Sequence, residues 1–188
     1  MKAVAIIPAR GGSTRIPRKN IRPFFGKPII AYSINTARRS RIFDAVYVST
    51  EDEEIGKIAR QYGADLIHRP PELAEIGAPD CGTQEVTRHA ITVLQGLGEK
   101  IDYACCIYPC APLLTPQDLS WAWEEMYGPY AYVSGLFYWG CAEAFLAHEP
   151  LRDDLQLPYP SKRAIDIDTL DDWQRAEEMY AAMHKVTA

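Results

Sequence analysis

The sequence lacks several features that mark common classes of protein. No apolar run approaches the length of a membrane span, and the Met1-Lys2 start leads into a strand-like segment instead of a signal-peptide core. The 5 cysteines form an odd set with no Cys-x-x-Cys pair, which argues against a zinc site or a disulfide framework. There is also no internal repeat, linker or low-complexity tract. We therefore expect a cytoplasmic protein whose cysteines are reduced and mostly buried.

An excess of positive charge is missing as well. The chain has 20 Lys and Arg residues against 25 Asp and Glu residues, giving a net charge of −5, which does not favour nucleic acid as a partner. Its 188 residues suit one domain with a substantial core. We therefore predict a single domain over residues 1–188, with no nucleic-acid or membrane partner.

Two familiar glycine motifs for nucleotides are absent from the first loop, residues 8–20. It contains neither Gly-x-x-x-x-Gly-Lys-Ser/Thr nor Gly-x-Gly-x-x-Gly. It does follow Val4–Ile7, an apolar run typical of a buried parallel strand, and ligands bind at the carboxyl ends of such strands. Gly11 and Gly12 allow a close backbone approach with exposed N–H groups. Positive charge is concentrated around them, on Arg10, Arg15, Arg18 and Lys19. This composition predicts a polyphosphate site; an ordinary basic surface loop is the alternative.

The rest of the chain alternates strand and helix signals, which is typical of a parallel sheet covered on both faces. We predict an α/β fold, a three-layer α/β/α sandwich with a mostly parallel, Rossmann-like sheet. The predicted strands after the first are 45–49, 64–68 and 104–108, and the predicted helices are 29–39, 50–62, 83–94 and 115–127. Thr50–Glu53 is interpreted as a capping box, and Thr115 as an N-cap ahead of a first-turn proline.

A second functional signal lies near the end of the chain, in residues 164–173. In a strand, side chains alternate between faces, so Asp166 and Asp168 would share one side while Ile165 and Ile167 pack into the core. Two neighbouring carboxylates favour a cation, and Mg²⁺ takes one or two carboxylates together with substrate phosphates. The alternative is a polar edge strand that runs into a helix capped by Thr169.

Several of these segments resemble one family. Ile6–Ser13, Arg15–Pro17, Lys19-Asn20 and Gly26–Pro28, together with the Asp-Ile-Asp-Thr segment from Asp166, resemble the bacterial cytidylyltransferases that activate nine-carbon acidic sugars, the CMP-sialic acid and CMP-pseudaminic acid synthetases. Cys105–Tyr108 and Phe137–Gly140 look more like the pseudaminic acid branch. The resemblance implies the nucleotidyltransferase type of fold and a homodimer. It also implies Mg²⁺-dependent transfer of CMP from CTP to the anomeric hydroxyl of a nonulosonic acid, pseudaminic acid before sialic-type sugars, with release of pyrophosphate.

The resemblance also implies residue roles. Arg10, Lys19, Asp166 and Asp168 would be catalytic, and the two aspartates would hold the metal. The nucleotide would contact Ala9, Arg10, Gly11, Gly12, Ser13, Arg15, Lys19, Asn20, Arg69 and Thr83. For Ser13 and Asn20, loop-stabilising hydrogen bonds are the alternative. Phe137 and Tyr138 would contact the sugar, with packing as the alternative. No histidine is obviously placed as a base, since His68, His89, His148 and His184 are scattered.

One departure from the family concerns Ser134–Leu136. Relatives carry several tens of residues at this point, which form much of the lobe that dimerises and contacts the sugar. We therefore interpret residues 1–133 as the nucleotide-binding part, and residues 134–188 as a remnant of the sugar and dimer region with the metal strand and a C-terminal helix. Two alternatives follow: a CTP- or CMP-binding protein without turnover, or a cytidylyltransferase for another acidic sugar.

Overall fold

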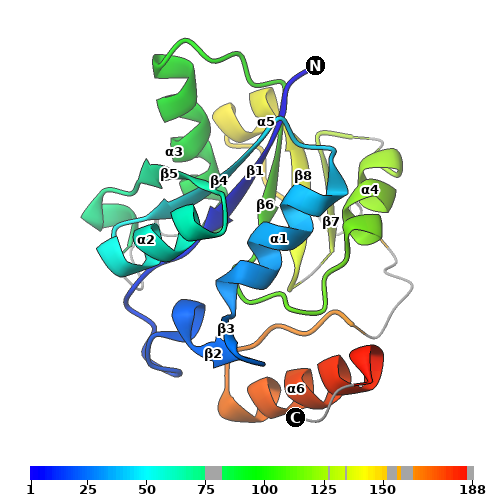
Figure 1. Cartoon of the computed structure of the whole chain (residues 1–188). Coiled ribbons are helices and arrows are strands. Elements are labelled where there is room, and N and C mark those ends of the chain that lie inside the picture. The colour runs from blue at the N-terminus through cyan, green and yellow to red at the C-terminus, as the bar shows by residue number, and fades with distance from the viewer. Residues whose placement is uncertain (75–81, 127, 134, 152–155, 158–162, 186–188) are drawn as a thin grey trace.

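The protein is built on a six-stranded sheet with strand order β5-β4-β1-β6-β8-β7 (Figure 1). The computed structural model describes residues 1–74, 82–126, 128–133, 135–151, 156–157 and 163–185. The strands are β1 (Ala3–Pro8), β4 (Ala45–Thr50), β5 (Asp65–His68), β6 (Tyr103–Ile107), β7 (Tyr130–Val133) and β8 (Phe137–Cys141). β5, β4, β1 and β6 are parallel, whereas β8 runs antiparallel to β6 and β7. The predicted mostly parallel sheet is confirmed.

Helices cover both faces of this sheet (Figure 1). α1 (Ile30–Ser40), α2 (Glu53–Gln61) and α4 (Pro116–Glu124) lie on one face, and α3 (Thr83–Gly96) and α5 (Ala142–Leu146) lie on the other. Successive side chains of a strand face opposite sides, so Ala5 and Ile7 of β1 pack with the first group and Val4 and Ile6 with the second. All four are fully buried. The predicted three-layer sandwich therefore has two cores, one on each side of β1.

A third, smaller core lies at the end of the sheet. It joins the first loop through Ile16, the short pair β2 (Pro23–Phe24) and β3 (Lys27–Pro28), and Trp173 of α6 (Leu170–His184). The Phe24 ring lies 5.2–5.6 Å from four aromatic rings, those of Phe25, Tyr32, Trp173 and Tyr180. Figure 1 shows α6 at the same end of the molecule as β2 and β3. This core holds the first loop against the C-terminal segment, which is distant in sequence.

The C-terminal aspartate segment is extended but is not a strand, so that prediction was wrong. Residues 164–168 form no ladder with a neighbouring strand in the described part of the chain. The predicted alternation nevertheless holds, because Ile165 and Ile167 are 6% and 0% exposed and pack into the third core. Thr169 caps α6 in a capping box with Asp172, as its sequence position indicated. Packing of the isoleucines, not strand pairing, sets the side on which the aspartates lie.

The cap of α2 also differs from the prediction. Thr50 is the last residue of β4, and the N-cap is Asp52, whose side chain accepts hydrogen bonds from the amides of Glu54 and Ile55 at 3.0 and 2.9 Å. The strand continues farther than expected, and Asp52 is the residue with the extended backbone that an N-cap needs. At α4, Thr115 forms the predicted cap, but the helix ends at Glu124 instead of residue 127.

A tight hairpin joins β7 and β8, at the point where the sequence is shorter than the family that it resembles. Val133 pairs with Phe137, the Leu136 N–H donates to the Val133 carbonyl at 3.2 Å, and Gly135 adopts a left-handed backbone with a φ of 75°. A methyl group added at Gly135 would lie 3.1 Å from the Asp166 Cβ. The shortened junction therefore packs directly against the aspartate segment.

Two expectations from composition can be compared with the described residues. Cys105, Cys106 and Cys110 are buried free thiols, as predicted. None of the helices seen in the described ranges has the length and apolar character needed to cross a membrane.

Candidate active site

A cavity of about 300 Å³ opens at the carboxyl end of the sheet, where ligands bind to open α/β folds. Pro8 at the end of β1, Pro109 just after β6 and Thr83 at the start of α3 contribute to its wall. The predicted nucleotide contacts that line it are Arg10, Ser13, Arg15, Lys19, Asn20, Arg69 and Thr83, joined by Asp168 from the predicted metal pair. The structure thus brings five separate parts of the chain to one cavity: the first loop, Arg69, the start of α3, Pro109 and Asp168.

The cavity is strongly cationic. Four cations line it, Arg10, Arg15, Lys19 and Arg69, whereas Asp168 is the carboxylate of the lining within the described ranges. Asp168 Oδ1 lies 3.0 Å from Arg15 Nη2 and 3.2 Å from Lys19 Nζ. The Arg10 guanidinium has no polar partner among the residues that the structure describes. The arrangement therefore suits a ligand with several negative charges.

Arg69 is the most deeply buried of these cations, at 3% exposed. Its guanidinium donates to the Ser49 carbonyl at 2.7 Å and lies close enough to Arg10 and Glu51 to feel both charges. Burial lowers the pKa of Arg69, while Glu51 raises it and Arg10 lowers it further. A buried guanidinium bonded to a neutral carbonyl retains donors for an acceptor-rich ligand.

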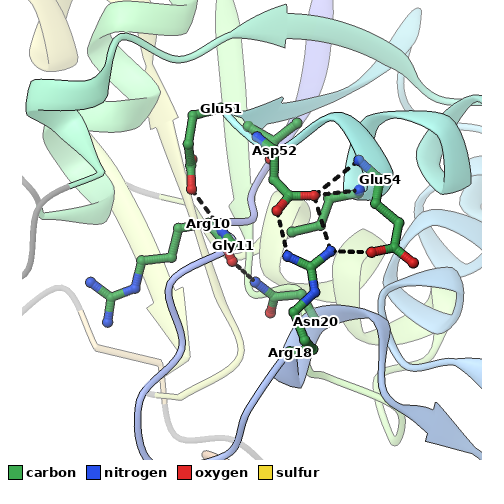
Figure 2. Close-up of polar contacts among 9 residues, drawn as sticks. Arg10, Gly11, Arg18, Asn20, Glu51, Asp52 and Glu54 are labelled. Carbon is green, nitrogen blue, oxygen red and sulfur yellow. Dashed lines mark hydrogen bonds and ion pairs between the residues drawn. The ribbon is translucent and has the colours of Figure 1, made fainter.

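Arg18 does not belong to the cationic cavity, although the charge pattern of the loop suggested a shared role. Its guanidinium bonds to the carboxylates of Asp52 and Glu54, on the far side of Gly11 from the Arg10 side chain (Figure 2). The Asp52 hydrogen bond raises the pKa of Arg18 further, so it stays charged. Arg18 is therefore an internal cross-link, which charge composition alone could not distinguish from a ligand-binding cation.

The backbone of the loop is only partly free to meet a ligand. Gly11 N–H donates to Glu51 Oε1 at 2.7 Å, and Ser13 N–H donates to the Gly11 carbonyl at 3.0 Å. Ala9 is fully buried and its amide bonds to the Ser49 carbonyl at 2.9 Å. The amides of Arg10 and Gly12 have no partner in the described part of the chain. Neither glycine belongs to the described cavity lining, and of the two it is Gly12 whose amide is without a partner there.

Alanine substitutions should separate the two glycines. At Gly11 a Cβ would lie 2.4 Å from Asp52 Oδ2, whereas at Gly12 nothing lies within 4 Å. We expect Gly11→Ala to destabilise the fold by about 1–3 kcal/mol through overpacking, and Gly12→Ala to change stability by less than about 0.5 kcal/mol. Denaturant unfolding measures both. Loss of CTP binding in Gly12→Ala with normal stability would place the ligand at that glycine, and equal destabilisation of both variants would contradict the loop geometry.

Asn20 uses its side chain within the protein. It is 5% exposed, its Nδ2 donates to the Arg10 carbonyl at 2.8 Å, and the Cys110 thiol lies 3.3 Å from its Oδ1. Burial raises the pKa of Cys110 to about 12, so the thiol keeps its proton and can donate it. The geometry favours the loop-stabilising alternative for Asn20, while Ser13 and Thr83 remain at the cavity wall.

Asp166 and Asp168 are the expected pair of metal ligands, of which Asp168 belongs to the described cavity lining and Asp166 does not. Desolvation and the Asp168 charge raise the pKa of Asp166, against the opposing charges of Lys19 and Arg15. In the described part of the chain, no group of three or more His, Cys, Asp or Glu side chains could form a metal cage. Two carboxylates beside a cationic cavity instead fit Mg²⁺ that is also held by substrate phosphates and water. The donor set therefore fits the expected ion.

Phe137 and Tyr138 do not lie at the cavity, which corrects their expected role as sugar contacts. They are 1% and 2% exposed, and they alternate along β8 into the two opposite cores of the sheet. The geometry favours the packing alternative for both side chains, because β8 pairs with β6 on one side and β7 on the other and a core covers each of its faces. Their surfaces are not available to a sugar in this structure.

Glu51 and Asp52 are the residues at the loop that sequence reasoning missed. Their signal was an acidic run directly after an apolar strand that pairs with β1, since adjacent parallel strands end at the same edge. That edge faces a basic loop, so a charge contact could have been predicted. Instead, the run was interpreted only as a helix start.

The Arg18 contact also predicts how stability depends on pH. The Arg18 hydrogen bond and two helix amides hold the pKa of Asp52 below its ordinary value. Ionised Asp52 therefore stabilises the fold above about pH 4, and this contribution is lost as pH falls through the lower native pKa. Denaturant unfolding of the wild type and Asp52→Asn should show a stability difference at neutral pH that narrows in acid. A difference that is constant across this range would contradict the ion pair.

The doubly covered sheet, with a cationic glycine loop at its carboxyl edge, defines an α/β protein of the nucleotidyltransferase type. A model of the family described as cytidylyltransferase matches residues 4–134, and the chain belongs to that family. It is 46% identical over 127 residues to a pseudaminic acid cytidylyltransferase of Campylobacter jejuni, covering 66% of this chain and 53% of that protein. It is 42% identical over 92 residues to an N-acylneuraminate cytidylyltransferase of Escherichia coli, covering 49% of this chain and 21% of that one.

Comparison with solved structures supports the fold. The structure of a CMP:2-keto-3-deoxy-manno-octonic acid synthetase, determined with CTP, superposes with a TM-score of 0.73 at 14% identity, covering 97% of this chain and all of the other. The likeness to the pseudaminic acid branch confirms the predicted family resemblance. The chain spans about half the length of the pseudaminic acid relative.

Proposed function

We propose that this chain binds CTP and transfers CMP to the anomeric hydroxyl of a nonulosonic acid, with pseudaminic acid as the preferred sugar. The observation that carries the proposal is one cavity whose described lining contains four cations and one carboxylate. The names of the relatives supply the nucleotide and the sugar class, since two that match over 66% of this chain are pseudaminic acid cytidylyltransferases.

Each charged residue has a role in this proposal. Arg10, Arg15 and Lys19 hold the phosphates, together with the free amide of Gly12, and buried Arg69 with Thr83 contacts the nucleoside. Asp166 and Asp168 hold Mg²⁺, which when bound supplies charge stabilisation at the phosphate being transferred. Because Lys19 and Arg15 contact Asp168, the cations and the metal-binding carboxylate meet at one point.

The reaction needs positioning more than covalent chemistry. The anomeric oxygen attacks the α-phosphorus in line, the bond to the β-phosphate oxygen breaks, pyrophosphate leaves and the hydroxyl proton passes to solvent. Arg10 and Lys19 stabilise the charge that develops on the phosphates. No histidine belongs to the cavity lining within the described ranges, so this proposal assigns no histidine as a general base.

A second function is supported by the hairpin between β7 and β8. Phe137 and Tyr138 are buried, and the junction at Gly135 is short, so the chain offers little surface for a sugar on this side. This observation favours a CTP- or CMP-binding protein without turnover, or transfer to another acidic sugar. A homodimer, carried from the family resemblance, would add surface from the partner. A cytoplasmic setting is consistent with the buried free thiols.

Pyrophosphate release separates these functions. Purified protein is given CTP and Mg²⁺ with pseudaminic acid or N-acetylneuraminic acid, and CTP binding is measured by calorimetry in parallel. We expect CTP to bind and pseudaminic acid to give faster release. Binding without release from either sugar would favour the non-catalytic function, and failure to bind CTP would refute the proposed site.

A further inference from the structure

The first loop is attached to the start of α2 at two points (Figure 2). Gly11 N–H donates to Glu51 Oε1 at 2.7 Å. Farther along, the Arg18 guanidinium bonds to both Asp52 oxygens and also to Glu54. The loop is thus held by consecutive carboxylates of one neighbouring segment.

The anchoring carboxylate of Asp52 is itself fixed. Its Oδ1 caps α2 by accepting from the amides of Glu54 and Ile55, and the same oxygen receives Arg18 Nη2 at 3.1 Å. Its side chain also rests against Gly11, where no Cβ could fit. The position of Asp52 is therefore set by a helix, which is more rigid than a loop.

Each anchor is next in sequence to a cation of the cavity lining. Arg10 precedes Gly11 directly, and Lys19 follows Arg18 directly. Arg18 has a left-handed backbone with a φ of 56°, and the chain turns there into the short helix from Lys19 to Ile21. The Lys19 amine then reaches Asp168 at 3.2 Å. A change at either anchor would redirect a cation without removing it.

We propose that Arg18, Asp52 and Glu51 are positioning residues that hold the loop ready for a nucleoside triphosphate before the ligand arrives. The identity of the ligand in this inference rests on the proposed function. The anchoring of the loop does not, because its contacts are made within the protein itself. A prearranged loop binds more tightly because less conformational freedom is lost on binding.

The test uses Arg18→Gln, Asp52→Asn and the double variant. Asparagine keeps the helix cap while weakening the ion pair. Glu53→Gln is the matched control: it removes a charge from the same first turn at an exposed residue with no polar partner in the described part of the chain. Hydrogen exchange of the loop is measured in the free proteins, CTP dissociation constants by calorimetry, and melting temperatures alongside.

The direction in which each variant changes CTP affinity distinguishes a positioning role from a purely electrostatic one. Through charge alone, Arg18→Gln would weaken CTP binding and Asp52→Asn would strengthen it. Positioning instead predicts that each single variant weakens CTP binding by about tenfold to a hundredfold. The double variant should bind CTP no more weakly than either single variant, and hydrogen exchange of the loop should be faster in both single variants than in the wild type. Glu53→Gln should change neither binding nor exchange, and Arg18→Lys should recover part of the affinity.

Other outcomes overturn the proposal in recognisable ways. Opposite shifts for Arg18→Gln and Asp52→Asn, or unchanged loop exchange, would refute positioning even with CTP bound normally by the wild type. If CTP affinity fell only as far as the melting temperature of each variant fell, the contact between Arg18 and Asp52 would serve the stability of the fold alone. Absence of CTP binding in the wild type, with faster loop exchange in the variants, would refute the proposed function while leaving the loop anchor intact.

Discussion

Replacing Asp168 with alanine is expected to lower CMP transfer by roughly a thousandfold or more, while CTP binding without metal is retained or strengthened. Transfer falls because the proposed metal loses one of two carboxylates. Binding is retained because Arg15 and Lys19, 3.0 and 3.2 Å from Asp168, are both released for the phosphates. Pyrophosphate release measures the first effect, and calorimetry with a chelator measures the second.

Asp171→Ala is the matched control for this result. Asp171 is exposed, lies in the first turn of α6 and has no polar partner among the described residues. We expect near-normal transfer from it. A large loss of metal-free CTP binding in Asp168→Ala would show that the carboxylate orders the loop cations, and normal transfer would refute the metal assignment.

Replacing Trp139 with alanine is expected to destabilise the fold by about 3–5 kcal/mol. Trp139 is fully buried on β8, its ring stacks on Phe43 at 4.9 Å, and its indole N–H donates to the Leu119 carbonyl at 3.1 Å. The substitution leaves a cavity and removes the hydrogen bond to the Leu119 carbonyl. Denaturant unfolding with an unchanged m-value would measure the loss.

This experiment bears directly on the shortened junction. Leu97, which is 76% exposed, gives a control substitution to alanine with an expected change within about 0.5 kcal/mol. If Trp139→Ala cost as little as Leu97→Ala, the β7–β8 hairpin would not be part of the cooperative core. The tight turn would then be a local contact without structural consequence.

Local patterns predicted much of the fold because they reflect local physics. The apolar run of β1, the Thr115 and Thr169 caps and the alternation of Ile165 and Ile167 each depend on near neighbours in sequence. The strand assignment at 164–168 failed because a strand is defined by a partner, and alternation alone does not supply one.

The sequence predicted which residues gather at the site, but not how their side chains are arranged. The sequence put Arg10, Arg18 and Lys19 in one loop, yet Arg18 turns to Asp52 because a carboxylate from a neighbouring strand end lies within reach. Phe137 and Tyr138 were misplaced for a similar reason. Their burial depends on how β8 enters the sheet, which no local pattern specifies.

The contact between Gly135 and Asp166 also bears on how such a protein can be remodelled. The hairpin turn lies against the aspartate segment, so a segment inserted between Val133 and Leu136 would leave and re-enter the sheet beside those carboxylates. The β1 loop and the cavity cations lie outside that point of entry. Under the proposed function, a segment that recognises the acceptor could therefore be exchanged at this one turn, with the cations of the cavity left unchanged.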